Sequence, residues 1–93
     1  MHVRAVRFTD VTAERVEQLV TRIEESGPPP GVTAAGIQLL FDEDQGTALA
    51  LQFFDTAEDL EAGERVFAAM DPAETPGTRV SVDRCVLKVE RRL

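Results

Sequence analysis

The 93-residue chain contains no Trp, no Tyr and no Asn, and it has only one Cys and one His. A single cysteine excludes an internal disulfide and any thiolate cluster that would hold zinc or an iron–sulfur centre. The histidine, His2, lies at the second position, where a side chain is more often frayed or exposed than bound to haem. We therefore predict no metal and no cofactor. Most known sets of catalytic residues also cannot be assembled from this chain, because they include residue types that it lacks.

Long hydrophobic runs are also absent. No apolar stretch reaches the roughly 18 residues that a membrane span requires, and the N-terminus lacks a signal-peptide core. We therefore predict a soluble, cytoplasmic protein without a membrane partner. The length suits a single domain, residues 1–93, and the 43% hydrophobic and 29% charged residues are typical of a chain stabilised by packing.

Basic residues are scarce, at 10 against 17 acidic ones, and the formal net charge is -7 at pH 7. This charge repels phosphate backbones at long range, so we expect no nucleic-acid partner. Residues 79–93 differ from the rest of the chain, because basic residues outnumber acidic ones there. Their cationic side chains either pair with the acidic middle of the chain and face water, or form an anion site together with Arg4 and Arg7. These side chains are Arg79, Arg84, Lys88, Arg91 and Arg92.

Hydrophobic periodicity predicts two successive strand-helix-strand units. Alternation of period two indicates strands over residues 2–8, 32–41, 47–54 and 79–89. Apolar residues at helical spacing follow Thr12 and Thr56, each of which offers an N-cap oxygen. An acidic stretch ending at Gly46 joins the second and third strands, which predicts a β-hairpin.

This order of elements predicts an α+β protein with a ferredoxin-like βαββαβ fold. Right-handed crossovers would give a four-stranded antiparallel sheet with both helices on one face. We expect the other face to carry Val6, Phe8, Leu40 and Phe54. Because a contiguous apolar patch rarely stays exposed, these four residues are candidates for a homodimer interface.

Residues 53–59, Phe-Phe-Asp-Thr-Ala-Glu-Asp, form the predicted junction between the third strand and the second helix. Together with the expected dimer, they resemble the antibiotic biosynthesis monooxygenase-like dimeric α+β barrels, where this junction often reads Trp-Glu-Ser/Thr followed by acidic residues. The acidic turn at Gly46 and the strand entry at 79–82 also look like small uncharacterised members. The resemblance implies a sheet-to-sheet dimer, a dimeric α+β barrel whose interior binds a small molecule.

The catalytic residues of that family do not transfer to this chain. Haem-degrading members are known for an Asn, a Trp and a His, and quinone-forming members for Asn, Trp, Tyr and Arg. Here Phe54 stands at the Trp position and Val6 lies near the Asn position. The chain is therefore expected to bind an apolar or aromatic small molecule without the known catalytic residues. The alternatives are a cofactor-independent monooxygenase acting on an aromatic or quinone-type substrate, and a structural dimerisation module with a filled barrel.

Two glutamines are candidates for orienting a ligand in the barrel cavity. Gln38 and Gln52 are expected to fall on equivalent faces of the hairpin, where they bind a ligand carbonyl or hydroxyl, or hydrogen-bond each other. The aromatic rings of Phe8 and Phe54 form interface core or line the site of a flat apolar ligand.

The last predicted strand carries two further candidates, and the pattern leaves open which of its faces is inward. Cys85 is either a small buried hydrophobe or a nucleophile activated by Arg84 or Arg4. Asp83 is either a general base or a surface ion-pair partner of Arg84. The complete set of pocket candidates is Arg4, Val6, Phe8, Gln38, Gln52, Phe54, Asp83 and Cys85.

Overall fold

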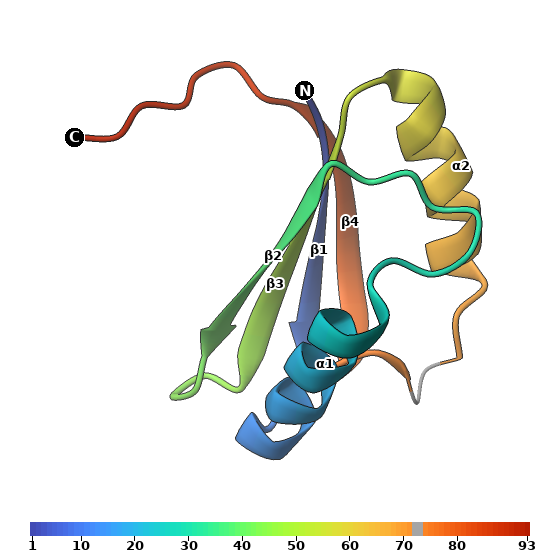
Figure 1. The fold of residues 1–93 in the computed structure, drawn as a ribbon. Helices are drawn as coiled ribbons and strands as arrows, with labels where there is room; N and C mark the ends of the chain where they lie inside the picture. Colours follow the sequence, from blue (N-terminus) through green and yellow to red (C-terminus); the bar gives the residue numbers. More distant parts are fainter. Residues whose placement is uncertain (72–73) are drawn as a thin grey trace.

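A computed structural model describes residues 1–71 and 74–93, in which strands and helices follow one another in the predicted order (Figure 1). Thr12 and Thr56 cap the two helices as expected, because their hydroxyl oxygens accept hydrogen bonds from the backbone N–H groups of Arg15 and Asp59, at 3.2 and 3.1 Å. The elements are β1 (His2–Thr9), α1 (Ala13–Ser26), β2 (Gly36–Asp42), β3 (Thr47–Phe54), α2 (Ala57–Ala68) and β4 (Thr78–Val86).

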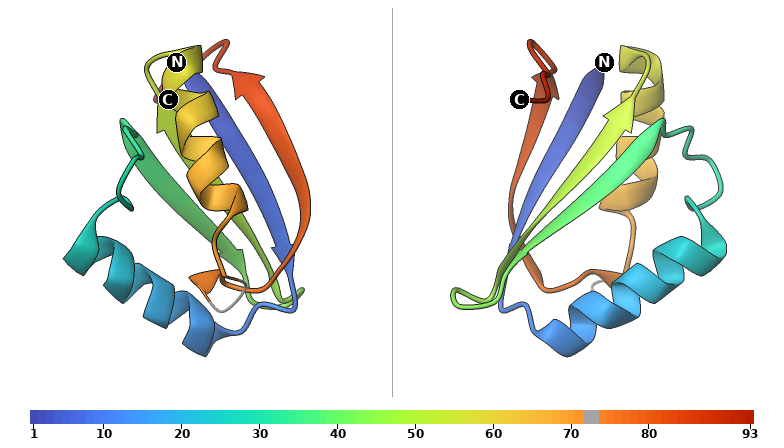
Figure 2. Two further views of the ribbon diagram at one scale, coloured as in Figure 1. Left: turned by 90° about the vertical axis from the view of Figure 1, so that its right-hand side faces the viewer. Right: turned by 60° about the vertical axis from the view of Figure 1, so that its left-hand side comes forward.

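The four strands form one sheet in the order β2-β3-β1-β4, and every neighbouring pair is antiparallel. Both helices lie on the same side of this sheet (Figure 2). The predicted ferredoxin-like α+β fold is therefore confirmed. We call the side of the sheet without helices the open face, and the side toward α1 and α2 the helix face.

Two strand boundaries differ from the sequence prediction. β2 begins at Gly36, because the preceding segment bends so that Val32 packs against Phe54 and Leu60 beneath α2. β4 ends at Val86, because its partner β1 begins at His2 and no strand pairs with it beyond that point. One further hydrogen bond, from the Leu87 amide to the Met1 carbonyl at 2.9 Å, closes the pairing.

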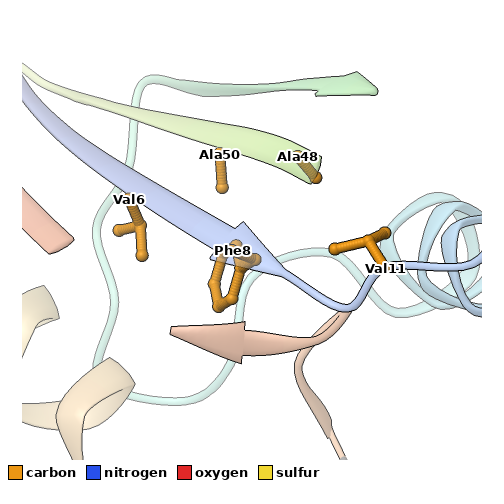
Figure 3. Close-up of a cluster of buried hydrophobic side chains, with 5 residues drawn as sticks. All are labelled: Val6, Phe8, Val11, Ala48 and Ala50. Atoms are coloured by element: carbon orange, nitrogen blue, oxygen red, sulfur yellow. The ribbon is translucent and has the colours of Figure 1, made fainter. Parts of the chain in front are cut away.

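The core lies between the sheet and the helices. One cluster contains Val6, Phe8, Val11, Ala48 and Ala50, and Figure 3 shows the side chains of β1 and β3 pointing to one side of the sheet. A second cluster, formed by Val32, Phe54 and Leu60, lies under α2.

This packing corrects the predicted interface. Val6, Phe8 and Phe54 are 1%, 6% and 0% exposed in the single chain, and they lie on the helix face. The error arose because alternation separates the two faces of a strand without saying which one meets the helices. The placement of Leu40 was right, since it pairs with Leu49 on the open face and is 47% exposed.

Gly63 allows α2 to approach the sheet closely. A Cβ atom at this position would lie 2.8 Å from Cε1 of Phe54, inside van der Waals contact. We expect Gly63→Ala to lower the free energy of unfolding by about 1–3 kcal/mol through overpacking, measured by urea denaturation. Gly36→Ala is the control, because its added Cβ would lie 4.0 Å from Phe53. Equal stability of the two variants would contradict the packing of Gly63 on Phe54.

Candidate functional site

A cleft opens on the helix face, between α1, α2 and the sheet. Helix α1 buries none of its residues completely. Val16, in its first turns, packs against the first core cluster, whereas Leu19 and Ile23 border the cleft. The cleft comprises two adjoining hollows of about 520 and 440 Å³. Both hollows are lined by Ile23, Ile37, Gln52, Phe67, Met70 and Glu74.

A buried arginine forms the polar part of the cleft floor. Arg4 of β1 and Gln52 of β3 are cross-strand partners and are only 3% and 6% exposed. Nη1 of Arg4 donates a hydrogen bond to Oε1 of Gln52 at 3.0 Å, and its guanidinium carbon lies 5.5 Å from the centre of the Phe67 ring. The amide and the ring hold the guanidinium in a fixed orientation.

Glu64 of α2 lies between two arginines of the sheet. Its carboxylate forms an ion pair with Arg84, and Oε2 lies 3.7 Å from Nε of Arg4, beyond hydrogen-bond distance. Both of these buried atoms, Nε and Oε2, lack a hydrogen-bond partner. Burial lowers the pKa of Arg4, which the negative charge of Glu64 opposes, while the hydrogen bond from Arg84 lowers the pKa of Glu64.

The lowered pKa of Glu64 predicts a contribution to acid stability. A carboxyl group whose pKa is depressed by folding stabilises the protein above its ordinary pKa of about 4.3, and this stabilisation is lost as the pH falls through the lower folded-state value. We expect the melting temperature of the wild type to fall more steeply between about pH 5 and pH 3 than that of Glu64→Gln. Glu61→Gln, at an exposed position on the same helix, is the control. Parallel melting curves for wild type and Glu64→Gln would contradict this role.

The structure brings four of the predicted site residues together. Arg4, Val6, Phe8 and Gln52 all line the second hollow of the cleft. Phe54 lies on the same face but is enclosed beneath α2 next to Gly63, within the core.

The expected pairing of Gln38 with Gln52 is wrong. In the β2–β3 register Gln52 lies opposite Ile37, and Gln38 lies opposite Leu51 on the open face. The cause is the turn, which places Asp42 opposite Thr47, so that even-numbered residues of one strand face odd-numbered residues of the other.

The candidates on β4 also lie away from the cleft. Asp83 and Cys85 are exposed and oppose Ala5 and Val3 of β1 on the open face, so the interpretation of Cys85 as a buried hydrophobe is wrong. Arg84 points to the helix face, where it pairs with Glu64 instead of Asp83. The expectation that the basic end of the chain pairs with the acidic middle is confirmed for this arginine.

Sequence reasoning missed the contribution of α2 to the cleft. Glu64 follows Gly63 on the side of α2 that contacts the sheet. An acidic residue next to a buried position of a helix was the sequence feature that could have indicated its role. Phe67 and Met70 both line the cleft, where α1 does not cover them.

The open face carries an apolar surface along β2 and β3. Leu40 and Leu49 are cross-strand partners there, with exposed fractions of 47% and 37%, and half-buried Leu51 and Phe53 continue the surface along β3. Within residues 1–71 and 74–93 no helix is both long and apolar enough to cross a membrane. The same part of the chain contains no group of three or more His, Cys, Asp or Glu side chains arranged to hold a metal ion.

These features define a ferredoxin-like α+β protein with a cleft between its helices and its sheet. The chain is similar in structure to an uncharacterised NIPSNAP domain protein from Burkholderia xenovorans, with a TM-score of 0.53 and 15% sequence identity over 99% of each chain. This likeness supports the fold. A scan against protein-family models finds no match, and no curated protein matches the sequence.

Proposed function

We propose that this protein binds a small apolar or aromatic molecule in the cleft between its helices and its sheet. The observation that carries the proposal is the lining of the cleft, where apolar side chains surround a small polar floor of Arg4 and Gln52. Ligand sites commonly combine volumes of about 300–1,000 Å³ with a few placed polar groups. Ile37, 42% exposed in the cleft, is the kind of side chain that a ligand would cover.

Binding is favoured over catalysis as the role of the cleft. The one cysteine lies on the open face, and the polar groups of the floor, Arg4 and Gln52, bind each other instead of activating a nucleophile. The sequence prediction placed the ligand inside a barrel, whereas the proposed site lies on the opposite side of the sheet.

We further propose that the open face forms a homodimer interface. Leu40, Leu49, Leu51 and Phe53 form a contiguous apolar surface with no helix over it. Isologous dimers are the commonest assembly that covers such a surface, and face-to-face packing of two sheets would give the expected α+β barrel.

Native mass spectrometry of the protein purified from its own host tests both proposals. We expect a dimer that carries the added mass of a small molecule. A dimer that retains no added mass under the mildest conditions would contradict ligand binding and favour a structural module. A monomer would contradict the dimer, independently of whether it carries a ligand.

A further inference from the structure

We infer that the ligand of the cleft carries an anionic group, a carboxylate or a sulfonate, which binds the guanidinium of Arg4. This inference rests on the proposed function and names its class of ligand: an aromatic or other apolar body bearing one organic acid group.

The unused Nη donors of Arg4 are the main argument. A guanidinium has five N–H donors, and within residues 1–71 and 74–93 Arg4 forms one hydrogen bond, from Nη1 to Gln52. Its Nε faces Oε2 of Glu64 at 3.7 Å, so the remaining Nη donors are those that a ligand could engage. Arg4 is nevertheless 3% exposed and lines the second hollow. A buried charged group is normally hydrogen-bonded throughout, because each missing partner carries a desolvation penalty. An oxyanion is the acceptor that best matches the fork of an arginine.

The charge around the hollow supports the same class of ligand. Arg4, Arg15 and Arg79 line it together with one carboxylate, Glu74. Arg15 is already engaged, since it donates a hydrogen bond to the Thr75 carbonyl. In a chain of net charge -7, this is a local excess of positive charge.

Behind the floor, the neighbours of Arg4 leave its positive charge incompletely balanced. Glu64 faces Arg4 but also forms an ion pair with Arg84. One negative charge is therefore shared between two positively charged guanidinium groups. Arg79 and Arg84 both add electrostatic repulsion at Arg4. An anion bound in the hollow would relieve this repulsion.

The apolar walls indicate where the rest of the ligand lies. Ile23, Ile37, Phe67 and Met70 border both hollows, next to the polar floor. A flat hydrocarbon body would pack among these side chains with its acid group directed at Arg4. This arrangement distinguishes an aromatic acid from a neutral aromatic molecule of the same size.

A matched pair of probes tests the inference. 2-Naphthoate and 2-naphthylmethanol share one ring system and differ in charge, and their fluorescence can be titrated without protein background because the chain lacks Trp and Tyr. We expect Gln52→Glu, which gives Arg4 an internal carboxylate, to weaken naphthoate binding at least about tenfold and to weaken naphthylmethanol binding by a much smaller factor. Gln38→Glu, the same change on the open face, is the control and should leave both affinities unchanged.

Arg4→Lys is the second variant, because it keeps the positive charge and replaces the planar fork by an ammonium group. It should weaken naphthoate binding about tenfold and weaken binding of the alcohol by a smaller factor. Equal affinity of wild type for the two probes, or equal loss of both in Gln52→Glu, would overturn the anion inference while leaving the proposed cleft intact. Binding of neither probe to the wild type would overturn the proposed function and this inference with it.

Discussion

The substitution Phe54→Ala is expected to lower the free energy of unfolding by about 3–5 kcal/mol, because it removes a fully buried aromatic ring and leaves a cavity. The ring lies against Gly63 and packs with Val32 and Leu60, so both α2 and the segment before β2 lose their contact with it. Domains of this size are stable by about 5–15 kcal/mol, so the loss is a large part of the total. Urea denaturation followed by circular dichroism measures it, since the chain lacks Trp and Tyr.

Phe41→Ala is the comparison for Phe54→Ala. Phe41 is half-buried on the edge strand β2, where it packs against the first core cluster, so its removal should cost less, about 1–2 kcal/mol. Equal losses in the two variants would contradict the central place of Phe54 in the core. The test concerns the core of one chain, because Phe54 lies beneath α2 and has no exposed surface for a partner.

The substitution Leu49→Asp is expected to convert the proposed dimer into a monomer. Leu49 is 37% exposed and pairs with Leu40 on the open face. In a two-fold interface each copy would bury one added carboxylate together with its cross-strand neighbour Arg7. Desolvating these charges has a combined cost of about 3 kcal/mol or more, which is at least about a hundredfold in the dimer dissociation constant. Sedimentation velocity across a range of concentrations measures the change.

Val20→Asp is the control for Leu49→Asp. Val20 is 38% exposed, which matches Leu49, but it lies on α1 on the other side of the sheet. The dimer should survive this change. A Leu49→Asp protein that sediments as the wild type does would place the contact elsewhere, and splitting by Val20→Asp alone would transfer the interface to the helices.

The order and type of the elements could be predicted from local patterns. The alternation in residues 47–54 coincides with β3, and the threonines at 12 and 56 cap the helices as expected. These features depend on neighbouring residues along the chain, so the sequence contains the information directly. The ends of β2 and β4 depend on what lies across the sheet, and there the prediction was less accurate.

The same patterns could not predict which face of each strand lies against the helices. On β1 the helix face carries Arg4 as well as Val6 and Phe8. Because a charged residue is more typical of an exposed face, Arg4 favoured the wrong assignment of this face as the outer one. Arg4 is tolerated there because Gln52, Glu64 and the Phe67 ring surround it, and these partners come from segments distant in sequence. A pattern along one sequence provides no local signal for such a contact.

Helix α1 forms one wall of the cleft while burying none of its own residues. By contrast, Arg4 and Gln52 on the opposite side are fixed by a central pair of strands. For the proposed ligand, one side of the cleft is a helix with no fully buried residue, and the other side is a pair of hydrogen-bonded side chains on adjacent strands. We expect the helix to determine selectivity for ligand size and the strands to determine selectivity for the polar group. Substitutions along α1 should alter the size of the molecule that the cleft binds. Substitutions at Arg4 and Gln52 should alter which polar group it binds. The size preference and the polar-group preference could therefore change independently of each other.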